Sequence, residues 1–330
     1  MADIVLGLAA SHSPQLSAGA DMWFQHAARD AKRSELVGLD GELHTFDELI
    51  PNAPEGLAAE LKPEVAAAKY ERTQAAMTVL QEKLAEADVD IAIVIGDDQW
   101  ELFRDEGVPT FALYLGDQLY DEPKAPEVVA GLDKSLQAAQ WAQHGDALAW
   151  HPTHAELSSA ITDHLCIREF DISRFTTQMP DRTLGHAFTF PRYRMALPLE
   201  TPIVPIFINT YFPPNVPTPG RCFDLGVAIA EAIANWDSAA RVAVITSGGL
   251  SHFVVDERLD NQVLTGLRTG DRAAFAEIPR NYLRSGNSEI LNWICAAGAL
   301  TGLDPTIVDY VPGYRSEAGT GTGMAFAYWQ

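Results

Sequence analysis

The chain has 330 residues, enough to build a large hydrophobic core in one or two domains. Its 45 acidic residues outnumber its 23 basic residues and give a formal net charge of −22, which argues against a protein that binds nucleic-acid phosphates. No apolar run approaches the roughly 20 residues of a membrane span, and three widely spaced cysteines, an odd number, favour reduced thiols and a cytoplasmic setting.

The elements that the sequence predicts alternate in type along the chain. Short runs rich in β-branched residues predict strands at Ile4–Leu8, Ile91–Ile95, Phe111–Leu115, Ile203–Phe207 and Val242–Ile245. Helical patterns lie between and after them at Lys62–Ala87, Ala228–Ala234 and Ser288–Ala299. This alternation favours an α/β fold: a single domain over residues 1–330 whose central sheet is mixed or mostly parallel and is flanked by helices. We interpret segments 15–90 and 115–160 as insertions that cover a site.

Polar side chains follow three of these strands. His12 follows the first strand, Asp97, Asp98 and Gln99 follow the second, and His252 comes after the glycines of "ITSGGLSHFV". Each group could simply cap the next helix or turn. Because α/β proteins place their chemistry where strands end at one edge of the sheet, three such groups together favour an active site there.

The segment Leu283–Leu300 adds a carboxylate. Asn287 or Ser288 can cap the helix, which leaves Glu289 in its first turn, where the helix dipole favours negative charge. The rest of the helix is almost wholly apolar, so Glu289 can instead point inward, where a buried carboxylate needs a partner or a metal. With His12 and one more ligand, Glu289 would form the facial triad of a non-haem Fe(II) site.

Seven segments carry a resemblance to a known family: "GLAASHSPQL", "VIGDDQWELF", "GHAFTFPRYR", "NTYFPPNVPTPGRCFDLG", "SGGLSHFVVDERLD", "SGNSEILNWI" and "DYVPGYRSEAGTGTGMAFA". In this order they resemble the class III extradiol ring-cleavage dioxygenases, and more narrowly the catalytic β-subunit of protocatechuate 4,5-dioxygenase and its relatives that act on gallate and 3-O-methylgallate. The resemblance implies an Fe(II) enzyme that opens the ring of a small aromatic diol acid with O2. It also implies a homodimer or a higher homo-oligomer.

The same resemblance implies roles for single residues. His12 and Glu289 match metal ligands of the family, His252 matches its acid–base histidine, and His186 matches a second active-site histidine. The family's second metal histidine falls on Gln99, whose amide oxygen is a weaker, neutral ligand. The sequence therefore departs from the family at one of the three metal positions.

Several side chains could replace the missing imidazole. Gln99 itself or the neighbouring Asp98 ranks first, and Asp97 could instead orient His12 or a neighbour. His44 is an alternative, as is a cluster that we interpret as a solvated loop, made of His144, His151 and His154.

A carboxylated ring needs a cation in so acidic a chain. Arg315, with Tyr314 beside it, is the predicted substrate-binding pair, since an arginine can grip a carboxylate with two hydrogen bonds. Arg192 and Arg194 are alternatives. We interpret "GTGTG" at 319–323 as a flexible turn near the site. The departure at Gln99 keeps two other functions open: an O2-independent metal hydrolase or lyase that acts on a ring or diketone, and a non-catalytic relative without its metal.

Overall fold

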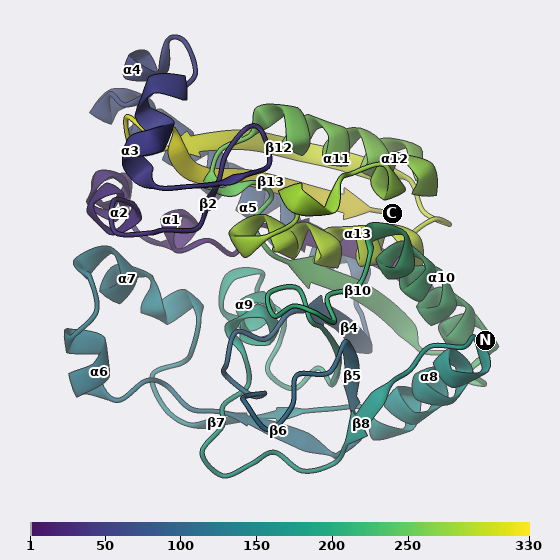
Figure 1. The fold of residues 1–330 in the computed structure, drawn as a ribbon. Coiled ribbons are helices and arrows are strands. Elements are labelled where there is room, and N and C mark those ends of the chain that lie inside the picture. The colour runs from purple at the N-terminus through teal and green to yellow at the C-terminus, as the bar shows by residue number, and fades with distance from the viewer. Residues whose placement is uncertain (1) are drawn as a thin grey trace.

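A nine-stranded mixed sheet forms the centre of the molecule in the computed structural model, which describes residues 2–330 (Figure 1). Its strands run in the order β11 (His252–Val254), β13 (Thr320–Trp329), β1 (Asp3–Ala10), β10 (Arg241–Ser247), β4 (Ile91–Gly96), β9 (Ile203–Ile208), β5 (Phe111–Tyr114) and β8 (Ser173–Phe175), and β12 (Pro305–Tyr314) pairs with β13. The neighbours β1, β10, β4 and β9 are parallel, whereas β13 is antiparallel to β1, β11 and β12. The predicted α/β fold with a mixed, mostly parallel sheet is confirmed.

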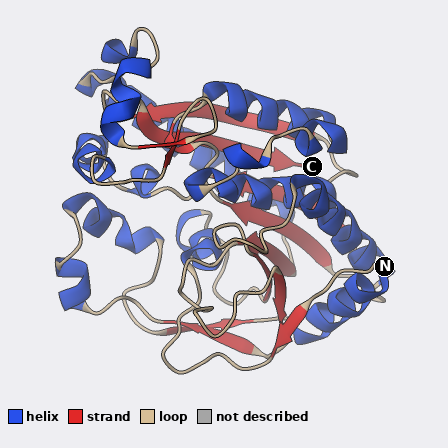
Figure 2. Ribbon diagram, in the orientation of Figure 1, coloured by secondary structure: helices blue, strands red, loops and turns tan. Residues whose placement is uncertain are grey.

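Helices cover both faces of this sheet, as Figure 2 shows. One hydrophobic cluster joins the sheet to α8 (Ala155–Ile167), α10 (Pro219–Asn235), α11 (Glu257–Thr269) and α13 (Ile290–Ala299). A second cluster joins the other face to α5 (Pro63–Ala87) and α9 (His186–Arg194). Because apolar partners lie on both sides, β4 and β9 are buried along their whole lengths, which explains their continuous apolar sequences.

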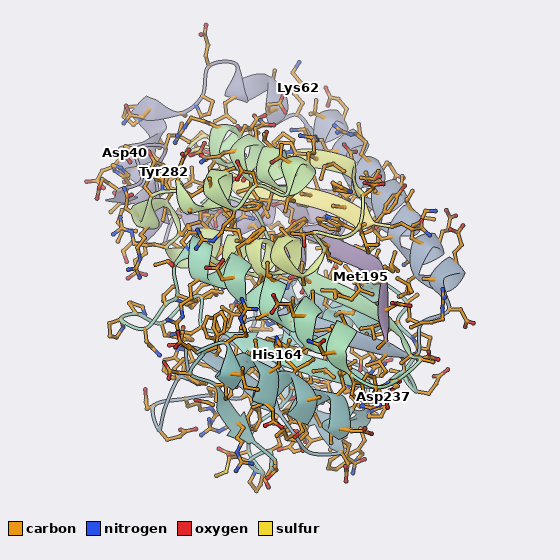
Figure 3. All side chains as sticks on the ribbon, turned by 90° about the vertical axis from the view of Figure 1, so that its right-hand side faces the viewer. Asp40, Lys62, His164, Met195, Asp237 and Tyr282 are labelled. Carbon is orange, nitrogen blue, oxygen red and sulfur yellow. The ribbon has the colours of Figure 1, made fainter. Side chains whose placement is uncertain are left out.

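The predicted helices are present, with shifted ends. The prediction at 228–234 found only part of α10, which begins at Pro219 because Thr218 caps it by accepting from the Arg221 backbone N–H at 3.3 Å. α10 packs closely on α13. Gly226 permits this approach, because a side-chain carbon at that position would overlap the backbone of Cys295. Figure 3 shows α10, with α8 and its His164 below, on the side facing the viewer.

Two sets of short elements lie outside the sheet. The first contains α1 (Pro14–Ser17), η1 (Ala20–Met22), α2 (Trp23–Asp30), β2 (Leu36–Val37), β3 (Leu43–His44), α3 (Phe46–Leu49), η2 (Ile50–Asn52) and α4 (Leu57–Glu60). The second contains β6 (Gln118–Asp121), α6 (Pro126–Ala130), α7 (Lys134–Ala139), η3 (Gln140–Ala142) and β7 (Ala149–Pro152). Shorter elements near the C-terminal third are α12 (Arg272–Ala276), η4 (Arg280–Tyr282) and η5 (Ser285–Glu289). Within residues 2–330, no helix is both long and apolar enough to cross a membrane.

The interpretation of "GTGTG" as a flexible turn is wrong for most of its length. Only Gly319, with φ +72°, lies in the turn, whereas Thr320 begins β13 and the segment is paired with β11 on one side and β12 on the other. The small residues serve close backbone approach: a side-chain carbon at Gly321 would overlap the carbonyl group of Gly313 in β12.

Candidate active site

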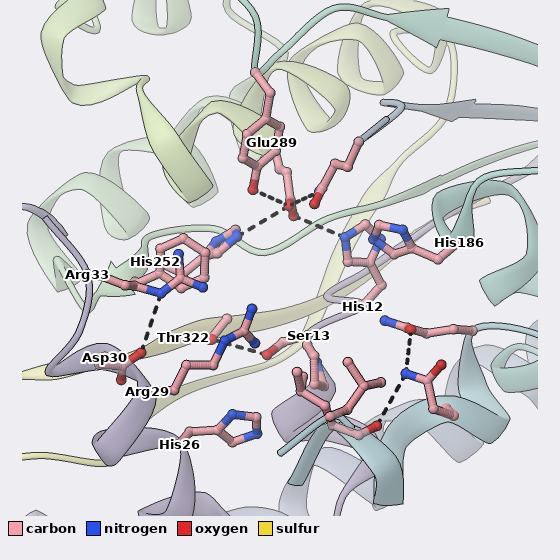
Figure 4. Close-up of a pocket in the computed structure, with 18 of the residues that line it drawn as sticks. His12, Ser13, His26, Arg29, Asp30, Arg33, His186, His252, Glu289 and Thr322 are labelled. Carbon is pink, nitrogen blue, oxygen red and sulfur yellow. Dashed lines mark hydrogen bonds and ion pairs between the residues drawn. The ribbon is translucent and has the colours of Figure 1, made fainter. Parts of the chain in front are cut away.

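The predicted strand-end residues do converge, at the carboxyl ends of the parallel strands. His12 lies two residues beyond β1, Ser247 ends β10, and Tyr211 follows β9. His12 and Tyr211 line a pocket of about 320 Å³, to which the segments around α2 and α7 also contribute (Figure 4), and Ser247 contacts His12 from behind. Glu289 and His252 reach the same pocket from η5 and β11. This is the position at which α/β folds usually carry an active site.

Glu289 lies at the centre of this site and is 2 % exposed. Its Oε2 lies 3.2 Å from His12 Nε2 and accepts from the Gly249 N–H at 2.7 Å. Its Oε1 lies 3.3 Å from His252 Nε2 and accepts from the Tyr211 hydroxyl at 2.9 Å. Burial alone would raise the pKa of Glu289, but His252 and His12 outweigh it and hold that pKa well below its ordinary value. The carboxylate makes no capping hydrogen bond to α13, so the inward orientation is the one adopted.

The partners of His12 decide which of its ring nitrogens carries a proton. The Ser247 hydroxyl donates to the Ala187 carbonyl oxygen at 3.1 Å, so towards His12 Nδ1, 3.0 Å away, it can only accept. His12 Nδ1 therefore carries the hydrogen, and a neutral ring would present its Nε2 lone pair to a Glu289 carboxylate oxygen. Such an arrangement is stable only with a cation between the two atoms, either a proton or a metal ion.

His252 is held in a similar way. Its Nδ1 lies 3.0 Å from the Leu250 carbonyl oxygen, which can only accept, and its backbone N–H donates to Asn287 Oδ1 at 2.6 Å. Burial lowers the pKa of His252, but the nearby Glu289 carboxylate more than offsets this, and the net result is a raised pKa. Only Nε2 of His252 can therefore exchange a proton with the pocket.

His186 begins α9 and lies beside His12, with the two ring centroids 4.7 Å apart. Its Nδ1 lies 2.6 Å from Glu101 Oε1. Burial opposes protonation, but Glu101 outweighs it and raises the pKa of His186 to about 9. Within residues 2–330, nothing forms a hydrogen bond with its Nε2, which leaves an N–H available to a bound molecule.

Of the two side chains predicted to replace the family's histidine, only Gln99 lies in the pocket. Its amide nitrogen donates to Glu289 Oε1 at 3.1 Å and to Asp97 Oδ2 at 3.2 Å, so it bridges two buried carboxylates. Asp98 instead accepts from the backbone N–H groups of Leu102 and Phe103 at 2.8 and 3.0 Å. The Asp98 carboxylate thus stabilises the turn that follows β4 and does not line the pocket.

Asp97 is buried and is held by the Asn292 side-chain amide, which donates to its Oδ1 at 2.8 Å. Burial and the charge of Glu289 raise the pKa of Asp97. Of the two roles predicted for Asp97, to orient His12 or a neighbour, the structure shows the second, towards Gln99, whereas Ser247 orients His12. Ser247, Tyr211 and Asn292 were missed; a strand-end position marks the first two.

Arg315 lines the pocket, but its guanidinium is already paired. Its Nε and one terminal nitrogen donate to the two carboxylate oxygens of Asp30 at 2.7 and 2.9 Å, and the other terminal nitrogen donates to Gln15 Oε1 at 3.0 Å. Both ions are buried, with exposures of 5 % for Arg315 and 1 % for Asp30. The side chain therefore anchors α2 to the β12–β13 hairpin.

The other predicted substrate-binding residues lie elsewhere. Tyr314 is outside the pocket lining and donates its hydroxyl to Glu257 Oε1 at 2.9 Å. Arg192 donates to backbone carbonyl oxygens in the loop after α9, and Arg194 donates to Gln74 Oε1 at 3.0 Å. The structure brings none of these three to the candidate site.

The histidines of the second insertion do not form a solvated loop, as the sequence led us to expect. His144 and His151 are 4 % and 1 % exposed, and they lie 2.5 and 3.7 Å from the two carboxylate oxygens of buried Asp121. His154 caps α8, and His44 pairs with Asp40 at the surface. The interpretation was wrong because both histidines pair with the buried carboxylate of Asp121, in β6.

Within residues 2–330, no group of three His, Cys, Asp or Glu side chains is arranged to hold a metal ion. His12 and Glu289 supply two such side chains, and the third position is the amide of Gln99. The set nevertheless fits a cation, because an Nε2 whose opposite nitrogen is protonated faces a carboxylate oxygen at 3.2 Å.

The sequence matches a known family model and two curated proteins. Residues 54–324 match the family model described as the catalytic LigB subunit of aromatic ring-opening dioxygenase. Gallate dioxygenase of Pseudomonas putida is 32 % identical over 163 residues, which are 45 % of this chain and 46 % of that protein. The 2,3-dihydroxyphenylpropionate/2,3-dihydroxicinnamic acid 1,2-dioxygenase of Comamonas testosteroni is 28 % identical over 169 residues, 49 % of this chain and 43 % of that protein. The matches thus span less than half the length of either curated relative. With a family match over most of its residues, the chain belongs to the LigB family of catalytic subunits of aromatic ring-opening dioxygenases.

Proposed function

We propose that this protein opens the ring of a small aromatic diol acid with O2, as an Fe(II)-dependent extradiol dioxygenase. The observation that carries the proposal is the Glu289 carboxylate, which faces the Nε2 atoms of His12 and His252 at 3.2 and 3.3 Å in one pocket. The names of the relatives point to gallate-like or dihydroxyphenyl acids as the substrate class. Gallate, 3-O-methylgallate and protocatechuate are the substrates that we favour.

His12, Glu289 and Gln99 would hold the iron. A bound Fe(II) would lower the pKa of the substrate hydroxyls and let electrons pass from the ring to O2. Ser247 keeps His12 in the tautomer whose Nε2 is free to bind, and Asp97 fixes the position of the Gln99 amide. The ligand set would carry one negative charge.

The histidines around this centre can move the protons that ring opening requires. His252 can take a proton from a substrate hydroxyl only at Nε2, because its Nδ1 is committed to the Leu250 carbonyl oxygen. His186 can donate from Nε2 to a substrate or oxygen atom, since Glu101 holds the ring in its protonated form. One histidine is thus placed as base and the other as hydrogen-bond donor.

The proposal is tested with protein loaded with Fe(II) in the absence of air. Oxygen uptake is measured with protocatechuate, gallate and 3-O-methylgallate, while absorbance follows a yellow ring-opened product. Uptake that matches product one to one supports the proposal and ranks the substrates. Bound iron without uptake on any of the three acids argues against this activity.

Gln99 gives a specific reason to keep a second candidate, an O2-independent metal hydrolase or lyase that acts on a ring or diketone. A neutral amide in place of an imidazole is a weaker ligand and leaves the site less suited to redox chemistry. Product formation under anaerobic conditions would favour this candidate. A protein that retains no iron after anaerobic loading would instead be a non-catalytic relative.

We also propose a cytoplasmic homodimer or higher homo-oligomer. The three cysteines are free thiols, which fits a reducing compartment. The exposed side chains of Trp141, Leu148 and Trp150, each about half exposed, offer apolar area to a second copy. Light scattering coupled to gel filtration gives the oligomeric state, and a monomeric mass would contradict this expectation.

A further inference from the structure

The charges that line the pocket do not cancel. Its carboxylates are Asp30, Glu101 and Glu289, and each lies beside a basic side chain in the pocket: Arg315, His186 and the pair His12 and His252, respectively. Three further cations line the same pocket, namely Arg29, Arg33 and Lys124. An excess of positive charge here is notable in a chain whose formal net charge is −22. Such an excess prepares a pocket for an anion.

Arg29 is the least committed of these cations. It lies in the last turn of α2, is partly buried, and within residues 2–330 its guanidinium makes no hydrogen bond or ion pair. Figure 4 shows its side chain extending from α2 into the pocket, on the opposite side from Glu289. A guanidinium with all five N–H groups free can grip a carboxylate with two parallel hydrogen bonds.

Two neighbours of Arg29 also have a buried nitrogen without a hydrogen-bond partner. Arg33 lies with its guanidinium carbon 3.3 Å from the centroid of the Phe253 ring, and its buried Nε makes only a long ion pair with Asp30 Oδ1, at 3.8 Å. Burial and the charge of Arg29 lower the pKa of Arg33 to about 10, so it is still a cation at neutral pH. Arg33 lies three residues beyond the end of α2, close enough for the charge of Arg29 to act on it, and an anion between the two guanidinium groups would offset their repulsion.

His26, from the same helix, is 4 % exposed and its Nε2 has no hydrogen-bond partner. Burial, with the charge of Arg315 adding to it, lowers the pKa of His26 to about 3, so the ring is neutral. A neutral ring whose Nδ1 accepts from the Ser135 hydroxyl, 3.3 Å away, would present an N–H at Nε2. A buried, unpartnered nitrogen in a pocket wall indicates a polar ligand there.

We propose that Arg29, with Arg33 and His26 beside it, binds the carboxylate of the aromatic acid. This inference rests on the proposed function, which places the two ring hydroxyls at His12, Glu289 and Gln99. His26 and Arg29 lie across the pocket from His12 and Glu289, and about 320 Å³ accommodates one substituted ring between the two ends. The subsite thus selects ring acids over uncharged diols and fixes which ring edge faces the metal ligands.

Other residues hold this subsite rigid. The bidentate pair of Arg315 with Asp30 ties the end of α2 to the β12–β13 hairpin. At the start of α2, buried Trp23 donates its indole N–H to the Gln15 carbonyl oxygen at 2.9 Å. The structure therefore uses Arg315 to position Arg29, which explains why an arginine predicted to bind substrate is already paired with a carboxylate.

Gallate and pyrogallol test the subsite, because they share the three ring hydroxyls and differ only in the carboxylate. Binding of each to Fe(II)-loaded protein is measured by calorimetry without O2, so no turnover is required. In Arg29→Gln, gallate should bind roughly 10–100-fold more weakly, as for the loss of a hydrogen-bonded charge pair. Pyrogallol binding should change by no more than about twofold. Arg29→Lys should bind gallate more tightly than Arg29→Gln but more weakly than wild type, since lysine keeps the positive charge but cannot form two parallel hydrogen bonds to a carboxylate.

Lys32→Gln is the matched control, because it removes one exposed positive charge three residues along the chain and outside the pocket. It should leave the binding of both ligands unaffected, and Arg29→Gln should keep the wild-type melting temperature because, within the described residues, the Arg29 side chain makes no hydrogen bond or ion pair. Equal weakening of gallate and pyrogallol in Arg29→Gln would overturn the subsite, as would unchanged gallate binding or a wild type without preference for gallate. Selective binding of gallate through Arg29 without oxygen uptake would instead preserve the subsite and reject the dioxygenase.

Discussion

Replacement of Ser247 by alanine tests the argument that a proton on His12 Nδ1 leaves Nε2 free for a metal. The Ser247 hydroxyl is fully buried, accepts from His12 Nδ1 at 3.0 Å and donates to the Ala187 carbonyl oxygen at 3.1 Å. In Ser247→Ala, His12 loses the contact that selects its tautomer and orients its ring. Loss of such an outer-sphere partner costs about 10–100-fold in metal affinity. The free energy of unfolding should also fall by about 1–3 kcal/mol, because buried polar atoms lose their partner.

The assay is equilibrium dialysis of Fe(II) without air, with urea unfolding in parallel. Thr246→Val is the control, because Thr246 is equally buried and its hydroxyl also donates to a backbone carbonyl oxygen, that of Ile95, at 3.1 Å. It should lose comparable stability and keep the wild-type metal affinity. The reasoning fails if Ser247→Ala binds Fe(II) as tightly as wild type, or if Thr246→Val loses as much affinity.

Three further predictions follow from the contacts of the site. His252→Phe should lower turnover by at least about 100-fold, since it removes a general base, while bound iron is retained; near-normal turnover would exclude the assigned role. Gln99→His should bind Fe(II) more tightly in dialysis, because an imidazole replaces a neutral amide, and weaker binding would count against Gln99 as a ligand. The pair of His186 and Glu101 should stabilise the fold most between pH 4.5 and 6.5: the contribution of His186 is lost as pH rises through about 9, and that of Glu101 is lost as pH falls towards about 2. Urea unfolding of Glu101→Gln measured from about pH 2 to about pH 9 should lack that dependence on both sides of the plateau, and an unchanged profile would refute it.

The sequence could predict the strands and the polar residues that follow them, because each of these signals is local. Strands such as β4 and β9 are apolar throughout, and the polar residues that follow them mark the edge where the site lies. His12, Gln99 and His252 were found in this way. The sequence pattern alone could not settle the orientation of Glu289, since a carboxylate in the first turn of a helix is compatible with a capping role. Only the packing of α13 turns the side chain inward.

Contacts between distant segments account for what the sequence could not show. The turn assigned to "GTGTG" became a strand because β11 and β12 pair with it on both sides, and glycine is otherwise a poor strand residue. The exposed loop assigned to His144 and His151 became a buried cluster because Asp121 lies between them. In both cases the neighbour that decides the conformation lies outside the local pattern.

Arg315 shows why a cation near an active site is weak evidence for substrate binding in an acidic protein. With 45 acidic and 23 basic residues, most arginines will find a carboxylate of the protein itself, and Arg315 finds Asp30, which lies 285 positions earlier in the chain. A paired guanidinium has little charge left to offer a ligand, and breaking a buried pair is costly. The informative cation is therefore the one that the fold leaves unpaired. Arg29 meets that criterion, and the sequence alone does not distinguish it from Arg315.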